Sequence, residues 1–167
     1  MRSEIERRLA LEIANASLTE EVQHDAKTCL LTPKGLEEVL RSHVQTTPES
    51  PLSMIYLDLN DFKIINDTLG HDAGDLAISE VGRILRENLR QHDIAARMGG
   101  DEFAIVLRGA QSRPRINQFV LRLHELISEA IEYRDPVTDK IHMITLSFSA
   151  GVARYPSDTR DVSLLSI

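Results

Sequence analysis

Hydrophobic and polar positions change period along the chain, and the changes predict the order of its elements. Residues 3–23 contain neither Gly nor Pro and carry apolar residues at helical spacing, which predicts a helix. That stripe fits both a helix packed on its own domain and the end of a linker from an upstream module. Thr32 and Pro33 then resemble an N-cap and the first residue of a second helix, which is expected to end near His43.

The middle of the chain reads as a strand followed by helices. The apolar run at 52–58 predicts a buried strand, and residues 62–69 predict a helical turn. After a break at 70–74, a long amphipathic helix is expected over 75–90. Its predicted buried face consists of Leu76, Ile78, Val81, Ile84, Leu85 and Leu89.

Residues 94–107 are two apolar runs joined by two glycines, a pattern typical of a β-hairpin. A helix is predicted over 116–133, a turn over 137–140, a strand over 141–153 and the start of another helix at 163–165. The core face of the helix at 116–133 is expected to include Phe119, Leu121, Leu123, Leu126 and Ile127. This order predicts an α+β fold, with a mainly antiparallel sheet flanked by helices.

Composition narrows the class of protein. A chain of 167 residues fits one domain, and a net charge of −7 argues against nucleic-acid binding, which needs a basic face. The single Cys29 indicates a reducing compartment, and the chain has no apolar run long enough to span a bilayer. We therefore expect a cytoplasmic protein that does not insert into the membrane.

Carboxylates stand at two positions where a fold can hold them rigidly. Asp101 and Glu102 follow the paired glycines at the hairpin tip, where adjacent acids suit Mg²⁺; a solvated tip is the alternative. Asp58 ends the predicted buried strand, where side chains at the rim of a sheet often form sites. Its alternative role is to start a turn with Asn60 and Asp61.

Taken together, the motifs resemble those of GGDEF-domain diguanylate cyclases over roughly residues 24–155. They read DLNDFKIIND at 58–67, LGHDAGD at 69–75, RMGGDEF at 97–103 and SAGVA at 149–153. The resemblance implies a fold like the palm of nucleotidyl cyclases, and the condensation of two GTP into cyclic di-GMP with release of pyrophosphate. It also implies a GGDEF domain over 24–167, preceded by a helical linker over 1–23 and an upstream sensor domain.

The resemblance also assigns roles to residues. The implied ligands of Mg²⁺ or Mn²⁺ are Asp58, the backbone carbonyl of Leu59, Asp101 and Glu102. Glu102 could also help to remove the proton of the attacking 3′-hydroxyl, and Gly99 and Gly100 would let the substrate approach the backbone closely. Because each domain would hold one GTP, the reaction would need a homodimer.

Four further residues are implied to contact GTP. Backbone N–H groups around Phe62 and the ammonium of Lys63 would contact the phosphates. Asn66 and Asp75 would read guanine, since Asp accepts from N1–H and N2–H₂, which adenine does not offer. Without the family, capping of neighbouring helices is the preferred role of Asn66 and Asp75.

Arg90 and Asp93 form an Arg-x-x-Asp element that the resemblance assigns to inhibition by bound cyclic di-GMP. The alternative is an Arg that complements the end of a helix and an Asp in a turn. The alternative function is a receptor with little turnover, which would bind cyclic di-GMP or GTP through Arg90 and Asp93 or at the substrate site. A purely structural dimerisation domain is a third possibility.

Three departures from the family pattern stand out. The opening motif, usually Asp-x-Leu-Thr-Gly-Leu-x-Asn-Arg, is altered at 25–34, where a local structural change is expected. Met98 replaces a common aromatic residue. The sequence also ends before the family's last helix, which normally supplies Lys and Arg to the triphosphate, so weak GTP binding is predicted.

Overall fold

The structure is a computed structural model that describes residues 23–109 and 111–159. The helix predicted over 3–23 lies outside these residues except for its last position, and so does the helix start predicted at 163–165. The helices are α2 (Pro33–Thr46), α3 (Phe62–Leu69), α4 (His71–Asn88) and α5 (Arg113–Ile127). The strands are β1 (Leu52–Leu59), β2 (Ile94–Gly99), β3 (Glu102–Arg108), β4 (Ile131–Arg134), β5 (Ile141–Ile144) and β6 (Phe148–Tyr155).

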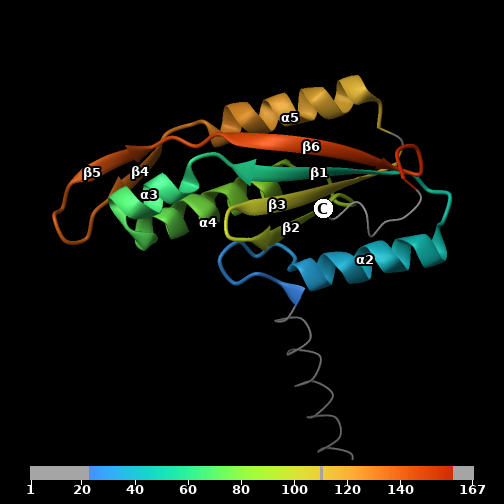
Figure 1. Ribbon diagram of the computed structural model, residues 1–167, viewed down its shortest axis with the longest axis horizontal. Helices are drawn as coiled ribbons and strands as arrows, with labels where there is room; N and C mark the ends of the chain where they lie inside the picture. Colours follow the sequence, from blue (N-terminus) through green and yellow to red (C-terminus); the bar gives the residue numbers. More distant parts are fainter. Residues whose placement is uncertain (1–22, 110, 160–167) are drawn as a thin grey trace, which may run out of the picture.

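A four-stranded antiparallel sheet in the order β2-β3-β1-β6 forms the centre of the fold (Figure 1). Helices α4 and α5 pack on one face, and α2 packs on the other. A separate pair, β4 and β5, extends beyond one end of the sheet. The predicted α+β fold with an antiparallel sheet flanked by helices is therefore confirmed.

The alternation of side chains along β1 determines which face each residue reaches. Ile55 and Leu57 are buried in the core beneath α4 and α5, whereas Leu52 and Met54 belong to the core beneath α2. Since successive residues point to opposite faces, Asp58 continues the row of Met54 on the α2 face. The strand thus buries its apolar residues on both faces and ends with an exposed carboxylate.

The start and the end of α4 differ from the prediction. Only Gly70 breaks the chain, and the helix runs from His71 to Asn88 instead of over 75–90. Gly74 lies inside the helix, and its missing Cβ leaves room for the side chain of Asn66 from α3. The buried face therefore begins at Ala73, and Leu76, predicted to be buried, is 37% exposed.

The predicted helix over 116–133 is wrong beyond Ile127. Residues Ile131–Arg134 instead pair with Ile141–Ile144, so their backbone groups are satisfied by a neighbouring strand. The expected single strand over 141–153 is accordingly two strands, β5 and β6, in different sheets. Leu121, predicted to be in the core, is 66% exposed on α5.

Candidate active site

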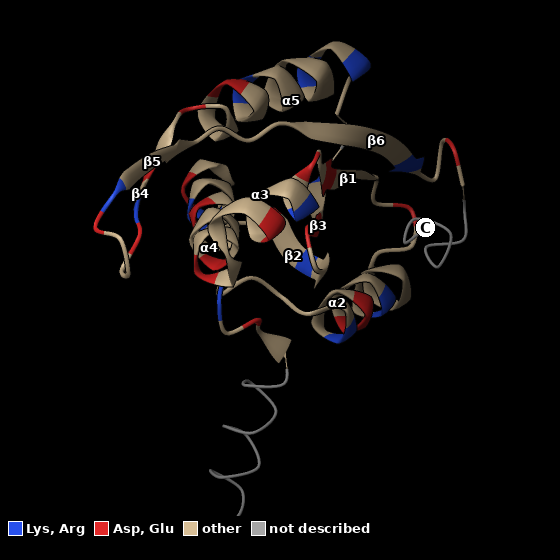
Figure 2. Cartoon of the chain, turned by 60° about the vertical axis from the view of Figure 1, so that its left-hand side comes forward, with Lys and Arg blue, Asp and Glu red and all other residues tan. Residues whose placement is uncertain are grey.

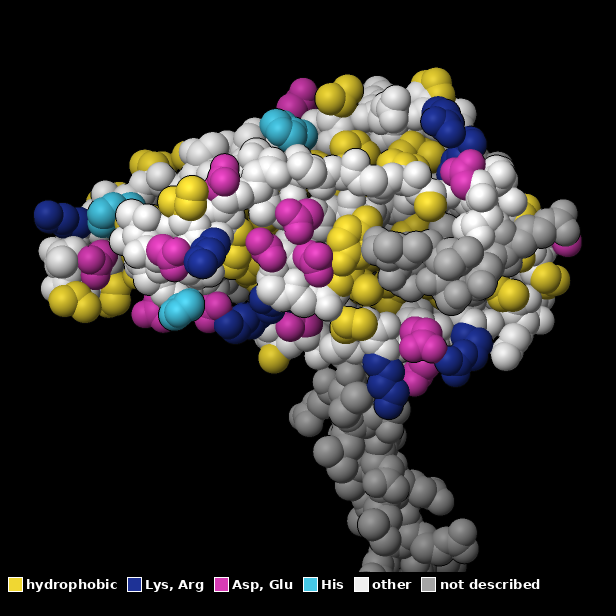
Figure 3. Space-filling model, viewed as in Figure 1, with side chains coloured by type: hydrophobic (Ala, Val, Ile, Leu, Met, Phe, Trp, Pro, Cys, Tyr) yellow, Lys and Arg dark blue, Asp and Glu magenta, His cyan; other side chains and the backbone are white. Residues whose placement is uncertain are grey.

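Two carboxylates meet across neighbouring strands. In the antiparallel register Asp58 of β1 lies directly opposite Glu102 of β3, and Ser149 of β6 flanks Asp58 on the other side. Side chains directly opposite on antiparallel strands have Cβ atoms about 4.5–5.5 Å apart. Figure 2 marks acidic positions on β1 and β3 beside α3, and Figure 3 shows acidic side chains gathered on the surface there.

The turn at Gly99 and Gly100 brings Asp101, the third acidic residue, close to the end of β1 by means of a backbone hydrogen bond. Gly99 and Gly100 have φ values of 153° and 50°, so both predicted turn glycines adopt positive φ. The register shifts between Arg97 and Gly99, which indicates a β-bulge just before the turn. The N–H of Leu59 then donates to the carbonyl of Asp101 at 3.2 Å, which ties the turn to the end of β1.

An arginine clamp holds the same turn from the other side. The Nη2 and Nε groups of Arg97 donate to the carbonyl of Gly100 at 2.8 and 3.1 Å, and its Nη1 lies 3.3 Å from a carboxylate oxygen of Asp25. Burial alone would raise the pKa of Asp25, but hydrogen bonds from Thr28 and the charge of Arg97 lower it below its usual value. Asp25, from the altered opening motif, therefore has a structural role.

Tyr56 is a neighbour of the acidic pair that the sequence did not reveal. It lies two residues before Asp58 on β1 and so points to the same face of the sheet. Burial raises its pKa, and the hydrogen bond with Glu102 and the charges of Glu102 and Asp58 raise it further. The hydroxyl therefore stays protonated beside the carboxylates of Asp58 and Glu102.

The donor set suits a hard divalent cation. Mg²⁺ is usually held by one or two carboxylates together with water and substrate phosphates, and Asp58 with Glu102 supplies such a pair. Within residues 23–109 and 111–159, no three His, Cys, Asp or Glu side chains form a group that could hold a metal without further ligands. Asp101 is joined to the pair only through its backbone, and its role as a metal ligand stays a prediction.

The residues predicted to bind substrate lie on α3 and at the start of α4, directly beyond β1. Phe62 begins α3, and the exposed Lys63 follows it. The Asn66 side chain packs over Gly74, where an added Cβ would lie 2.0 Å from its Oδ1 atom. Asn66 and Asp75 therefore lie close together where the two helices meet.

Comparison with known sequences matches residues 22–166 to the family described as diguanylate cyclase, GGDEF domain. The chain belongs to the GGDEF diguanylate cyclase family. It is 32% identical over 148 residues to the diguanylate cyclase TpbB of Pseudomonas aeruginosa, covering 87% of this chain and 33% of TpbB. It is also 31% identical over 151 residues to the cyclic di-GMP phosphodiesterase NbdA of the same species, covering 89% of this chain and 18% of NbdA.

A solved structure has the same fold as this GGDEF domain. The coiled coil and GGDEF domain of DgcB from Caulobacter crescentus, in complex with c-di-GMP, superimposes with a TM-score of 0.80 at 23% identity, covering 95% of this chain and 82% of that one. The palm-like fold is thereby confirmed. Among the described helices of this GGDEF domain, none combines the length and hydrophobicity that crossing a membrane requires.

Arg90 and Asp93 of this GGDEF domain line one groove of about 900 Å³ between the end of α4 and α5. The N–H of Asp93 donates to the carbonyl of Arg90 at 3.0 Å, and an oxygen of its carboxylate accepts from the N–H of Arg108 at 3.1 Å. Arg115 and Arg122 of α5 line the same groove. Sequence analysis did not single out these two arginines, although a spacing of seven residues, about two helical turns, places both on one face of a helix.

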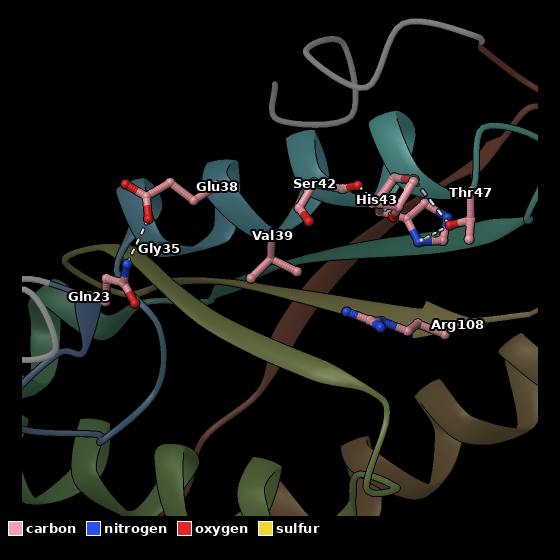
Figure 4. A pocket seen from close by; sticks show the side chains of 9 residues that line it. Gln23, Gly35, Glu38, Val39, Ser42, His43, Thr47 and Arg108 are labelled. Carbon is pink, nitrogen blue, oxygen red and sulfur yellow. Dashed lines mark hydrogen bonds between the residues drawn. The ribbon is translucent and has the colours of Figure 1, made fainter.

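A second hollow of the GGDEF domain, of about 380 Å³, lies between α2 and the end of β3 (Figure 4). The Nε2 group of His43 donates to the carbonyl of Ser50 at 2.9 Å, its Nδ1 atom lies 3.2 Å from the Thr47 hydroxyl, and Gln23 donates to Glu38 at 2.6 Å. Among the described residues that line it, none is a predicted site residue. The residues that line this hollow do not include Asp58, Asp101 or Glu102.

Proposed function

We propose that this GGDEF domain condenses two GTP molecules into cyclic di-GMP, with release of pyrophosphate. The observation that carries the proposal is the cross-strand pair of Asp58 and Glu102, next to the Gly-Gly turn, in a domain of this family. In this reaction the 3′-hydroxyl of each GTP attacks the α-phosphate of the other. Each domain holds one substrate, so two copies must face each other.

Individual residues have distinct roles in this proposal. Glu102 accepts the proton of the attacking hydroxyl or holds the metal with Asp58 and Asp101. When bound, Mg²⁺ or Mn²⁺ neutralises triphosphate charge and lowers the pKa of the attacking hydroxyl. Gly99 and Gly100 have no side chain that would block the substrate. The space beside them is open, because a Cβ added at either glycine would have no neighbouring atom within 4 Å.

The nucleotide lies across α3 and the start of α4 in this proposal. Backbone N–H groups at the start of α3, near Phe62, and the exposed ammonium of Lys63 contact the phosphates. Asn66 and Asp75 contact the base. The DgcB structure, which contains c-di-GMP in the same fold, is consistent with a guanine nucleotide as ligand of the family.

The requirement for two copies predicts how the rate depends on protein concentration. With Mg²⁺ and excess GTP, we expect cyclic di-GMP to form at a rate that rises more steeply than the protein concentration in dilute solution. Chromatographic measurement of product over a hundredfold range of protein concentration tests this. A rate strictly proportional to concentration over that range would show that one copy suffices.

A second function is favoured by the groove that contains Arg90 and Asp93. There the guanidinium of Arg90 would bond a guanine or phosphate, and the open Asp93 oxygen would accept from a guanine edge. Arg115 and Arg122 add positive charge beside them. Such a site would bind cyclic di-GMP and inhibit its own synthesis, or would make the domain a receptor if turnover is low.

Replacing Arg90 by alanine is expected to weaken cyclic di-GMP binding about ten- to hundredfold, the value of a charge-assisted hydrogen bond. Calorimetric titration of the folded domain measures the change. Arg41→Ala is the matched control, because Arg41 is exposed on α2 and pairs only locally with Glu37. Equal affinity in wild type and Arg90→Ala would exclude this groove as the binding site.

A further inference from the structure

Lys27 forms an ion pair with the residue proposed to read the base. Its Nζ group donates to Oδ1 of Asp75, and the two side chains are 46% and 50% exposed. Exposed pairs of this kind contribute little to stability, so stability does not account for a lysine at this position. The inference that follows rests on the proposed function, because it concerns the same nucleotide site.

The backbone that carries Lys27 is fixed against the helix that carries Asp75. The next residue, Thr28, is fully buried, and its N–H and hydroxyl both donate to Asp25, at 2.9 and 2.7 Å. Arg86 of α4 donates to the carbonyl of Thr28. Gly82 of α4 lies so close that an added Cβ would be 2.6 Å from the Thr28 Cβ. The geometry therefore holds Lys27 beside Asp75 in a defined place.

The pair presents a donor beside an acceptor, because an ammonium only donates and a carboxylate only accepts. Guanine presents the complementary order on its pairing edge, with O6 as acceptor next to the donors N1–H and N2–H₂. Adenine presents an amino donor at position six. A base whose N1–H bonds Asp75 would therefore have its six-position group next to the Lys27 ammonium.

We propose that Lys27 is a specificity-determining residue that donates to O6 of guanine while Asp75 accepts from N1–H and N2–H₂. An adenine in the same place would point its amino group at the ammonium, so that two hydrogen-bond donors would face each other. Lys27 stands where the family's opening motif usually has leucine. Recognition of O6 by this side chain would therefore be particular to this chain.

The experiment compares three bases on wild type and Lys27→Met by calorimetry with Mg²⁺. The probes are the α,β-methylene triphosphates of guanosine, inosine and 2-aminopurine riboside, which cannot release pyrophosphate. Inosine keeps O6, whereas 2-aminopurine keeps the 2-amino group and lacks both O6 and N1–H. Lys34→Met, at an exposed lysine in the first turn of α2, is the matched control for loss of one charge.

We expect Lys27→Met to weaken guanosine and inosine binding about tenfold or more and to leave 2-aminopurine binding unchanged. An equal loss for all three bases would mean that Lys27 attracts only the triphosphate, and would overturn the inference. Tighter binding would overturn it too, because Lys27 would then mask Asp75. If wild type binds the guanosine analogue and Lys27→Met binds it equally, the inference fails alone; if wild type does not bind it, the proposed function fails.

Discussion

Glu102→Gln is expected to lower the rate of cyclic di-GMP formation about 1000-fold or more, within the range that loss of a catalytic proton acceptor can cause. Glutamine keeps the size of the side chain and can still contact Tyr56, but it has no charge to accept a proton or hold a divalent cation. The measurement is product formed from Mg²⁺ and GTP at high protein concentration.

The control for this substitution is Glu132→Gln on β4, an exposed glutamate in the separate strand pair. It changes the net charge by the same amount and should leave the rate within about twofold of wild type. Both variants should unfold at the wild-type temperature. If Glu102→Gln kept more than a tenth of the rate, Glu102 would have no essential part in the reaction. Absence of product in wild type as well would favour the receptor function.

Phe103→Ala is expected to lower the free energy of unfolding by about 3–5 kcal/mol, the usual cost of deleting a buried aromatic side chain. Phe103 is completely buried and lies between Arg97 of β2 and Leu57 of β1 in the sheet. Its ring belongs to the core beneath α4 and α5. Removing it leaves a cavity under the strand that carries Glu102.

Denaturation in urea, followed by circular dichroism, measures this loss. Leu121→Ala on α5 is a suitable comparison, because that side chain is 66% exposed and its removal should change the free energy of unfolding by about 0.5 kcal/mol or less. A loss below about 1 kcal/mol for Phe103→Ala would contradict the packing described for β3. Comparing the two variants shows whether the loss of stability comes from the burial of the side chain or only from the removal of apolar atoms.

The elements next to the site were predicted well, because their conformation is determined by residues that are adjacent in the sequence. The buried strand β1, the short helix α3 and the glycine turn were all expected from the sequence. Errors arose where a distant partner decided the conformation. Residues Ile131–Arg134 form a strand because they pair with Ile141–Ile144, and Gly74 lies inside a helix, where its missing Cβ makes room for Asn66 of α3.

The candidate site shows the same division. The motifs named the residues, but the register that sets Asp58 opposite Glu102 is a property of the assembled sheet. The contact between Tyr56 and Glu102 joins two strands, and the pairing of Lys27 with Asp75 joins a loop to a helix 48 residues away. Neither contact follows from spacing along the chain, because both depend on how separate elements pack.

The pairing of β1 with β3 leaves no intermediate arrangement for the two carboxylates. Slipping β3 by one residue would turn Glu102 to the opposite face, and Asp58 is also held by its register with Ser149. The register therefore fixes the face on which both carboxylates lie within one folded domain. In the proposed reaction, control falls on the meeting of two domains, so that an input can act as a switch on assembly while each half-site stays unchanged.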